Sequence, residues 1–181
     1  MKAACKLIEH GADLTAQDSD GKTPLHLASN EGELDVARML IERGADLTAQ
    51  DKNGNTPLHL TSNGGDIDVA CTLIERGADL TAQDKNGNTP LHLALILGKE
   101  DVARMLIERG ADLTSKDNDG KNPLHLASYW GRVNVARKLI ERGADMKAQD
   151  KYWNTPLHLA LYYGRVNIAR MLIDHGADLT A

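Results

Sequence analysis

Histidine recurs along this chain at a fixed spacing of 33 residues, and histidine is both the commonest metal ligand and a common acid–base catalyst in proteins. The column comprises His26, His59, His92, His125 and His158. Repeats that pack through helices would set neighbouring imidazoles about 10 Å apart, whereas a zinc ion needs its ligands at about 2 Å. The spacing therefore argues against a ladder of metal sites, and we expect no metal and no cofactor.

The two cysteines are the candidate nucleophiles of the chain. Cys5 and Cys71 fall in the same column, two repeats apart, so stacking would separate them by about 20 Å, too far for a disulfide. A nucleophile also needs an activating base held by the fold, and nothing in the sequence pairs specifically with either cysteine. The chain contains no phosphate-binding glycine loop, HExxH or CxxC motif. We therefore expect a protein without enzymatic activity.

Net charge and hydropathy limit the partners and the cellular compartments that fit this chain. The 181 residues include 21 Lys and Arg against 26 Asp and Glu, a net charge of −5, which argues against general binding to nucleic acid or to an anionic membrane. No apolar run approaches the roughly 20 residues that cross a bilayer, and the first residues lack the apolar stretch of a secretion signal. Two cysteines without paired spacing fit a reducing compartment. The sequence predicts an intracellular, cytoplasmic protein, with the nucleus as an alternative.

Two motifs repeat every 33 residues and define the elements that must position these side chains. The motif Pro-Leu-His-Leu follows a capping Thr or Asn, at Thr23, Thr56, Thr89, Asn122 and Thr155. The motif Gly-Ala-Asp begins at Gly11, Gly44, Gly77, Gly110, Gly143 and Gly176. Two motifs at so regular a spacing indicate a repeat protein.

Each repeat is expected to hold two short helices and a turn. Thr23 is a good N-cap for a first helix, the proline after it suits the first helical position, and Gly32 can adopt the positive φ that ends the helix. A second helix is predicted over residues 34–43, because its apolar residues fall on one helical face. The polar stretch that follows contains Asn53 and Gly54, which favour a tight, hairpin-like turn.

These motifs closely resemble the ankyrin repeat family. The resemblance rests on Asp-x-x-Gly-x-Thr-Pro-Leu-His-Leu-Ala, on the glycine in mid-repeat and on Leu-Ile-x-x-Gly-Ala-Asp, and it covers essentially the whole chain. It implies an all-α solenoid of paired antiparallel helices with hairpin-like turns, elongated and curved. It also implies that each histidine of the column hydrogen-bonds its own turn and the neighbouring repeat. The expected units are a partial repeat at 1–17 and five repeats at 18–50, 51–83, 84–116, 117–149 and 150–181.

Three features depart from a uniform, self-contained array. Trp153 stands in a turn where other repeats have glycine, and a bulky residue at positive φ costs roughly 1 kcal/mol or more, so we expect that turn to be remodelled. Neither end shows a specialised polar cap, from which we expect a piece of a longer array. Residues 40–60 and 73–93 are identical, which indicates either recent duplication or assembly from a repeated template.

All the aromatic residues lie in the last two repeats, at positions that other repeats fill mostly with polar or small residues. These residues are Tyr129, Trp130, Tyr152, Trp153, Tyr162 and Tyr163. They are therefore not needed to close the repeat core, and Tyr and Trp are favoured binding anchors. In ankyrin repeat proteins, to which the resemblance points, turn tips and first-helix ends face the concave, partner-binding side. The predicted contact set adds Leu95, Ile96, Leu97, Arg132 and Arg165 to the aromatic residues.

Two other uses of the aromatic residues remain open. They could pack against a following repeat, or against one another as an improvised cap. Six rings at roughly 150–250 Å² each could bury about 900–1,500 Å², which is one side of an ordinary interface. Since a monomer rarely exposes so large an apolar patch without a use, a binding surface is the favoured interpretation.

The favoured function is a non-catalytic module that binds a protein or peptide, and we expect a monomer. Residues 1–83 hold 7 basic and 14 acidic residues, a net charge of −7, whereas residues 84–181 hold 14 and 12, a net charge of +2. Arg132 and Arg165 lie beside the aromatic residues, which is compatible with an amphipathic partner that has some acidic groups, although a solvated surface is the favoured explanation of the charges. Three alternatives stay open: a structural or engineered scaffold without a native partner, weak self-association through the aromatic residues, and binding of single-stranded nucleic acid by the C-terminal half.

Overall fold

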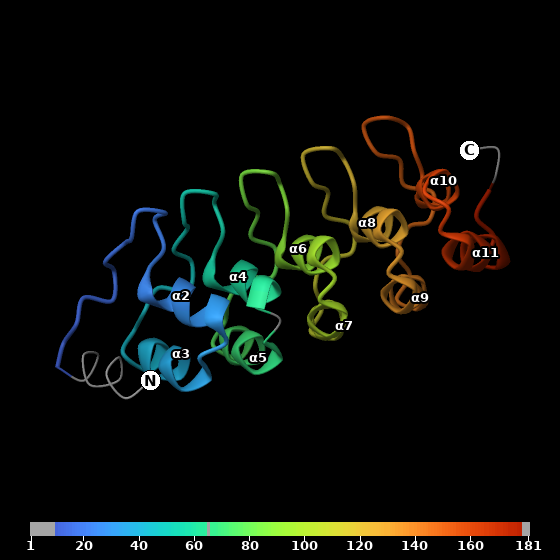
Figure 1. The fold of residues 1–181 in the computed structure, drawn as a ribbon. Helices are drawn as coiled ribbons and strands as arrows, with labels where there is room; N and C mark the ends of the chain where they lie inside the picture. The colour runs from blue at the N-terminus through green and yellow to red at the C-terminus, as the bar shows by residue number, and fades with distance from the viewer. Residues whose placement is uncertain (1–9, 65, 179–181) are drawn as a thin grey trace.

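The computed structural model describes residues 10–64 and 66–178, which form ten α-helices (Figure 1). In chain order they are α2 (Pro24–Glu31), α3 (Leu34–Glu42), α4 (Pro57–Gly64), α5 (Ile67–Glu75), α6 (Pro90–Leu97), α7 (Glu100–Glu108), α8 (Pro123–Trp130), α9 (Val133–Glu141), α10 (Pro156–Tyr162) and α11 (Val166–Asp174). Cys5 and residues 1–9 of the expected partial repeat lie outside the described residues. Within these bounds, none of the helices is long and apolar enough to cross a membrane.

The helices alternate between two rows. The even-numbered helices, α2 to α10, form the first row, and the odd-numbered helices, α3 to α11, form the second row below it in Figure 1, with a long turn above each pair. Each helix packs against its partner in the pair and against the corresponding helix of the next repeat. The described part of the chain is therefore an elongated all-α solenoid, as the sequence predicts.

The first helices α2, α6, α8 and α10 begin with a reciprocal cap. The Thr23 side chain accepts a hydrogen bond from the backbone N–H of His26, and the His26 ring accepts one from the backbone N–H of Thr23. Asn122 makes the same cap with His125, because its amide oxygen can replace the threonine hydroxyl as an acceptor. At the other end, Gly32 has a φ of 70° and ends α2 as predicted.

Leucine and alanine fill the core of a chain that has no phenylalanine. One leucine column in each row is buried in every repeat: Leu25, Leu58, Leu91, Leu124 and Leu157 in the first row, and Leu40, Leu73, Leu106, Leu139 and Leu172 in the second. These side chains belong to one continuous cluster that runs along the stack. The core is therefore closed by contacts between neighbouring repeats, as a solenoid requires.

The turns are joined to one another by backbone hydrogen bonds. The N–H of Lys52 donates to the carbonyl of Asp20 at 2.8 Å, and an equivalent bond joins each later turn to the one before it. Inside a turn, an aspartate carboxylate accepts two backbone N–H groups; in the first turn, Asp18 accepts from Asp20 and Lys22. The turns therefore form a regular row that presents the variable residues at its tips.

Trp153 leaves its turn unchanged, so the expectation of a remodelled turn was wrong. Its φ is 64°, and the φ of Gly120 at the equivalent position is 80°. The Trp153 N–H donates to the carbonyl of Asp150 at 3.1 Å, just as Gly120 donates to Asp117 at 2.9 Å. A Cβ on Gly120 would lie 3.0 Å from the backbone nitrogen of Lys151 in the next turn. No described turn stacks on the last one, so the indole has room there.

Candidate functional site

The histidine column joins the repeats. His59 is fully buried; its Nε2–H donates to the carbonyl of Asn88 in the next repeat at 3.0 Å, and its Nδ1 accepts from the backbone N–H of Thr56 at 3.1 Å. The same two contacts are made by His26, His92 and His125. Among the described residues, no group of three His, Cys, Asp or Glu is placed to hold a metal ion. These contacts confirm the role that the resemblance implies for the histidines.

Burial lowers the pKa of His59, His92 and His125 below the ordinary value of 6.5. The hydrogen bond from Nε2 to a backbone carbonyl opposes this shift in each ring without outweighing it. Because Nδ1 already accepts a backbone N–H, a second proton would face a donor instead of an acceptor. Nδ1 is thus occupied in capping its own helix, and Nε2 in connecting that repeat to the next.

Four of the aromatic residues form one connected group, which we call the aromatic cluster. The ring centroid of Tyr129 lies 4.9 Å from that of Trp130 and 4.3 Å from that of Tyr163. The centroids of Tyr162 and Tyr163 are 4.9 Å apart. A hydrogen bond with Tyr129 raises the pKa of the Tyr163 hydroxyl. The cluster lies at the ends of α8 and α10 and so joins two neighbouring repeats.

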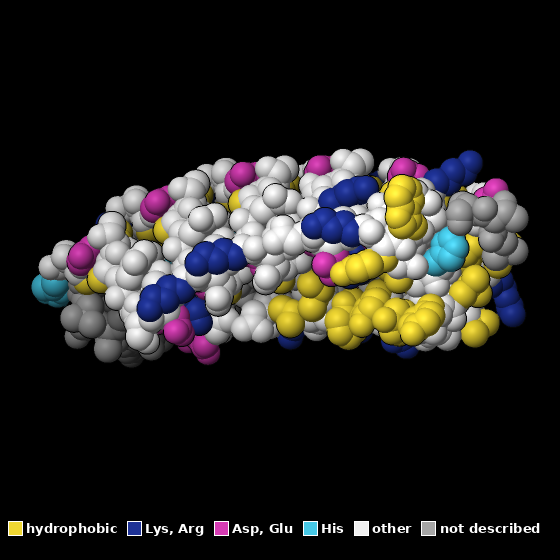
Figure 2. Space-filling view, turned by 90° about the horizontal axis from the view of Figure 1, so that it is seen from above, with side chains coloured by type: hydrophobic (Ala, Val, Ile, Leu, Met, Phe, Trp, Pro, Cys, Tyr) yellow, Lys and Arg dark blue, Asp and Glu magenta, His cyan; other side chains and the backbone are white. Residues whose placement is uncertain are grey.

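The aromatic cluster remains open to solvent despite these ring contacts. Tyr162 is 82% exposed, and Trp130 and Tyr163 are each 39% exposed. Figure 2 shows apolar side chains gathered toward the C-terminal end of the face seen from above, while the rest of that face is mostly polar. Packing of the rings against one another therefore accounts for only part of their surface.

A groove of about 380 Å³ lies beside the aromatic cluster, between the turns and the first helices. Its apolar wall is made by Ile96, Leu126, Tyr129 and Trp130. Its polar wall is made by residues of the turns, namely Asn86, Asn88, Asp117, Asp119 and Lys121. A hollow with one apolar and one polar wall suits a segment that offers both kinds of side chain.

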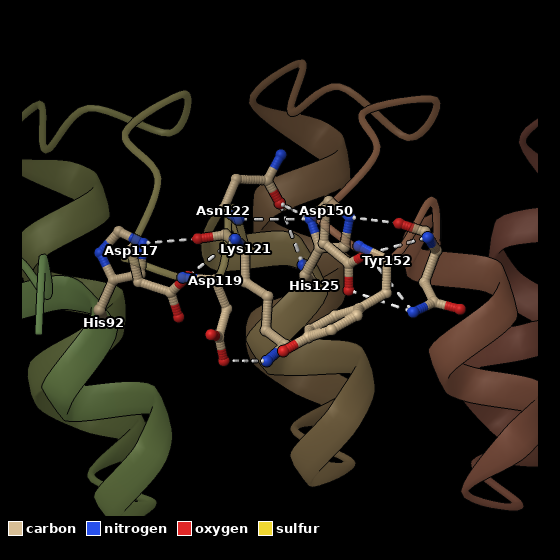
Figure 3. Close-up of polar contacts among 9 residues, drawn as sticks. His92, Asp117, Asp119, Lys121, Asn122, His125, Asp150 and Tyr152 are labelled. Carbon is tan, nitrogen blue, oxygen red and sulfur yellow. Dashed lines mark hydrogen bonds and ion pairs between the residues drawn. The ribbon is translucent and has the colours of Figure 1, made fainter.

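The charged residues of the polar wall leave mainly carboxylate exposed. Lys121 Nζ lies 2.7 Å from the Asp119 carboxylate, and the Lys121 side chain is 17% exposed against 51% for Asp119. Burial would lower the pKa of Lys121, but its hydrogen bond and ion pair with Asp119 raise it overall. The same hydrogen bond lowers the pKa of Asp119. The Asp117 carboxylate accepts the backbone N–H groups of Asp119 and Lys121 (Figure 3).

Tyr152 and Trp153 lie on the last turn. The ring contacts found among the described residues do not include either of them. They are 67% and 75% exposed, the Tyr152 side chain pointing back along the stack toward Lys121 (Figure 3). These two residues extend the exposed aromatic surface from the helix ends to the turn tips.

The aliphatic members of the predicted contact set divide into three environments. Leu95 is 1% exposed and belongs to the continuous core, so its place in the contact set is corrected here. Ile96 is half-buried and lines the groove. Leu97 is 45% exposed at the end of α6. Only the last two of these three neighbours are available to a partner.

Arg132 and Arg165 both reach back to the preceding repeat. The Nε–H of Arg132 donates to the carbonyl of Leu95 at 3.2 Å, and the Nε–H of Arg165 donates to the carbonyl of Tyr129 at 3.1 Å. Each accepting carbonyl lies in the last turn of a first helix, where the i+4 donor of the helix is missing; the Leu95 carbonyl also accepts from the N–H of the capping Gly98 at 3.3 Å. The two guanidinium groups thus clamp neighbouring repeats together. A bond to a neutral carbonyl leaves the positive charge of each guanidinium group in place, so the acidic groups expected in a partner stay a prediction.

Sequence analysis missed six residues of the groove: Asn86, Asn88, Asp117, Asp119, Lys121 and Leu126. Leucine stands at the position of Leu126 in every repeat, so its residue type carried no signal. Asp119 lies at a turn-tip position whose residue type differs between repeats. This variation could have identified it as a candidate binding residue.

Cys71 is a half-buried free thiol in α5. The Arg109 guanidinium lies 3.7 Å from its sulfur and also contacts Glu75 at 3.4 Å. The contacts found for Cys71 in the described chain thus bring it an arginine that is shared with a carboxylate, and they do not bring it a general base.

The repeat geometry agrees with a comparison to protein families. A family model described as ankyrin repeats in three copies matches residues 2–84, 44–117, 61–150 and 116–181. The chain belongs to the ankyrin repeat family. A search of curated proteins found no match. Ankyrin repeats generally serve as protein–protein interaction modules and are typically non-catalytic.

Proposed function

We propose that this ankyrin repeat protein is a non-catalytic module that binds a protein or peptide on the aromatic cluster, the groove beside it and the last turn tip. One observation carries the proposal: Trp130, Tyr162 and Tyr163 stay exposed beside a groove, although the leucine core beneath them is closed. Exposed Tyr and Trp around a groove are typical binding anchors.

Trp153 supports the proposal independently. A tryptophan at a φ of 64° costs about 1 kcal/mol or more relative to glycine. Its side chain is 75% exposed, so it regains little of this free energy through packing. A large apolar side chain held under strain with little internal contact favours a role outside the chain.

The walls of the groove indicate the chemistry of the partner. Trp130 and Ile96 offer apolar contact on one side, and Asp119 offers a half-exposed carboxylate on the other. We therefore expect a segment with an aromatic or aliphatic side chain flanked by basic residues or other hydrogen-bond donors. The two cysteines without paired spacing favour a reducing, intracellular setting for this encounter.

The proposal is tested by a crosslinking pull-down from cell extract with mass spectrometry. The wild-type chain is compared with a Trp130→Ala, Tyr162→Ala double variant. A partner captured by the wild type should be lost with the variant, and its affinity, measured by calorimetry, should fall by about 2 kcal/mol or more, roughly 30-fold.

The first repeat supplies a matched control. Asn30 and Glu31 occupy in α2 the positions of Tyr162 and Trp130 in the later repeats. An Asn30→Ala, Glu31→Ala variant should therefore keep the wild-type affinity. Unchanged binding by the double variant of the aromatic cluster would defeat the proposal.

The identity of residues 40–60 and 73–93 favours a second candidate, a scaffold without a native partner. A well-folded chain that retains no specific protein in the pull-down would support this candidate. Sedimentation at several concentrations tests self-association through the aromatic cluster, which would appear as a mass that rises with concentration and falls back in the double variant.

A further inference from the structure

Acidic residues disappear from the start of the second helices along the array. The first turns of α3, α5 and α7 contain the acidic residues Asp35, Asp68, Glu100 and Asp101. The first turns of α9 and α11 contain none. At the position of Asp101 in α7, these two helices have Asn134 and Asn167. The Asn134 amide donates to the Glu100 carboxylate of α7 at 3.2 Å, so the first turn of α9 has an acidic neighbour from the preceding repeat although it carries no acidic residue of its own.

This change alters the surroundings of an arginine column. Arg104, Arg137 and Arg170 occupy the same position in α7, α9 and α11. Arg104 forms an ion pair with Asp101, three residues earlier. Arg137 and Arg170 have asparagine at that place, are both exposed, and belong to none of the ion pairs found within residues 10–64 and 66–178. The guanidinium groups of Arg137 and Arg170 thus lack the carboxylate, three residues earlier, that neutralises Arg104.

The two arginines line one groove. The groove has a volume of about 320 Å³ and lies between α9 and α11, which are neighbours in the second row of helices (Figure 1). Val133 and Arg137 line it from α9, and Asn167, Arg170 and Met171 line it from α11. Asp174, the last residue of α11, and His175 complete the lining. The groove therefore combines two guanidinium groups with one carboxylate, one imidazole, one amide and two apolar side chains.

We propose that this groove is a second docking surface, which binds an acidic segment of a partner protein whose Asp or Glu residues are interspersed with aliphatic ones. A guanidinium group binds carboxylate through two parallel hydrogen bonds. Val133, which is half-buried, gives an aliphatic side chain a contact that a nucleic acid backbone or a free anion would not use, whereas Met171 is 7% exposed and adds little to it. Asp174 also lines the groove, at the C-terminal end of α11, and leaves the guanidinium groups in excess.

This surface is separate from the aromatic groove. The residues that line the two grooves do not overlap. A third hollow lies between them, and it shares Trp130 with the aromatic groove and Val133 and Asn167 with the arginine groove. The new surface is thus reachable by a partner whether or not the aromatic cluster is occupied.

The test measures fluorescence anisotropy with a fluorescein-labelled peptide of alternating glutamate and leucine and with a matched peptide that has glutamine in place of glutamate. The wild-type chain should bind the glutamate peptide, more weakly at higher salt, and should bind the glutamine peptide at least about tenfold more weakly. An Arg137→Ala, Arg170→Ala variant should bind the glutamate peptide about tenfold more weakly than wild type.

Matched variants separate this site from general electrostatics and from the aromatic cluster. Arg104→Ala changes the same column position in the preceding repeat and should alter affinity less than about twofold, because Asp101 already neutralises that arginine. The Trp130→Ala, Tyr162→Ala variant should keep full affinity for the glutamate peptide. Circular dichroism verifies that each variant keeps the wild-type helix content.

Several outcomes would overturn the proposal. They are no binding of the glutamate peptide, equal binding of both peptides, an equal loss with Arg104→Ala, or loss with the aromatic double variant. Displacement of the peptide by inorganic phosphate or by a single-stranded oligonucleotide at lower concentration than by unlabelled peptide would also overturn it, since the groove would then recognise phosphate.

Discussion

The buried histidines are expected to make the stability of the protein depend on pH. Their pKa values in the folded chain lie below 6.5, the value of an exposed histidine. The unfolded chain therefore binds more protons as pH falls through 6.5, and the stabilisation present above that pH is lost progressively below it. The aspartates whose pKa is lowered from 3.8, such as Asp79, add a second loss only in the range below about 3.8.

A urea titration at several pH values tests this expectation. The urea midpoint should fall between about pH 7.5 and about pH 5. The fall should be smaller in a His92→Gln variant, which removes one of the titrating rings. A midpoint that stays constant or rises over this interval would show that the folded pKa values are not lowered.

Trp153 is expected to lower the stability of the turn that holds it. Its φ of 64° is unfavourable for any residue with a Cβ, and its exposed side chain packs little. Trp153→Gly should therefore raise the free energy of unfolding by up to about 1 kcal/mol. Chemical denaturation followed by circular dichroism measures the change.

The control for this variant is Gly87→Ala at the equivalent position of an inner turn. A Cβ there would lie 2.8 Å from the backbone nitrogen of Asn118, in addition to the strained φ of 77°. This variant should be destabilised. A Trp153→Gly variant that is less stable than wild type would mean that the indole makes a stabilising contact.

At the scale of the helix, the packing of α2 against α4 explains why glycine stands at residue 64, where the other repeats have larger residues. Gly64 ends α4, and a Cβ at this residue would collide with the carbonyl oxygen of Asn30 in α2. Exchange of an exposed helical glycine for alanine normally stabilises a helix by about 0.5–1 kcal/mol. At Gly64 we expect the opposite sign, because the backbones of two helices would have to separate.

Thermal denaturation of Gly64→Ala measures this effect as a lower midpoint. Glu31→Ala, at the equivalent position of α2, serves as its control and should leave the midpoint almost unchanged, since Glu31 is exposed. A higher midpoint for Gly64→Ala would indicate that α2 and α4 can move apart without loss of packing.

The arginine clamps show how helices of different repeats are held in register. Arg132, just before α9, donates to a carbonyl of α6, and Arg165, just before α11, donates to a carbonyl of α8. The start of each of these second helices is thus bonded to the end of the first helix of the preceding repeat. In the second repeat, the Asp66 side chain instead caps its own helix by accepting from Val69 N–H. The last repeats are therefore tied together by contacts that the second one does not use.

At the scale of the whole molecule, the linear stack is expected to unfold in parts. Each repeat contacts only its neighbours, so a defect in one repeat should weaken distant repeats less than near ones. Leu58 is 1% exposed in α4, and Leu58→Ala should destabilise the structure around it by about 2–5 kcal/mol. Both tryptophans lie in the last two repeats and report on that end alone.

Urea denaturation of Leu58→Ala is followed by circular dichroism and by tryptophan fluorescence. The dichroism midpoint should fall more than the fluorescence midpoint, because dichroism reports all helices and fluorescence reports the C-terminal end. Equal shifts of both midpoints would mean that the array unfolds as a single unit.

The C-terminal repeats carry both proposed surfaces, and these surfaces differ in charge. The aromatic groove exposes mainly carboxylate beside its rings, whereas the groove between α9 and α11 exposes two guanidinium groups. The overall charge of +2 for residues 84–181 conceals this division. A partner that engages both surfaces would therefore need basic and acidic segments in separate places.

Sequence alone determined the period, the helix pairs and their caps. These features depend on residues three or four apart, or on the fixed spacing of 33, and both kinds of spacing can be counted along the chain. The aromatic residues also stood out in the sequence, because they occupy positions that the repeat does not need for its core.

Only the tertiary structure decided which of these residues face a partner. Leu95 and Leu97 are near neighbours in α6, yet the first is buried in the stack and the second is exposed. Arg132 bonds a carbonyl 37 residues earlier, an offset that no motif predicts. Both grooves lie between elements of different repeats, so their lining depends on how the repeats pack, and that packing follows from the shapes of side chains in contact instead of from their order.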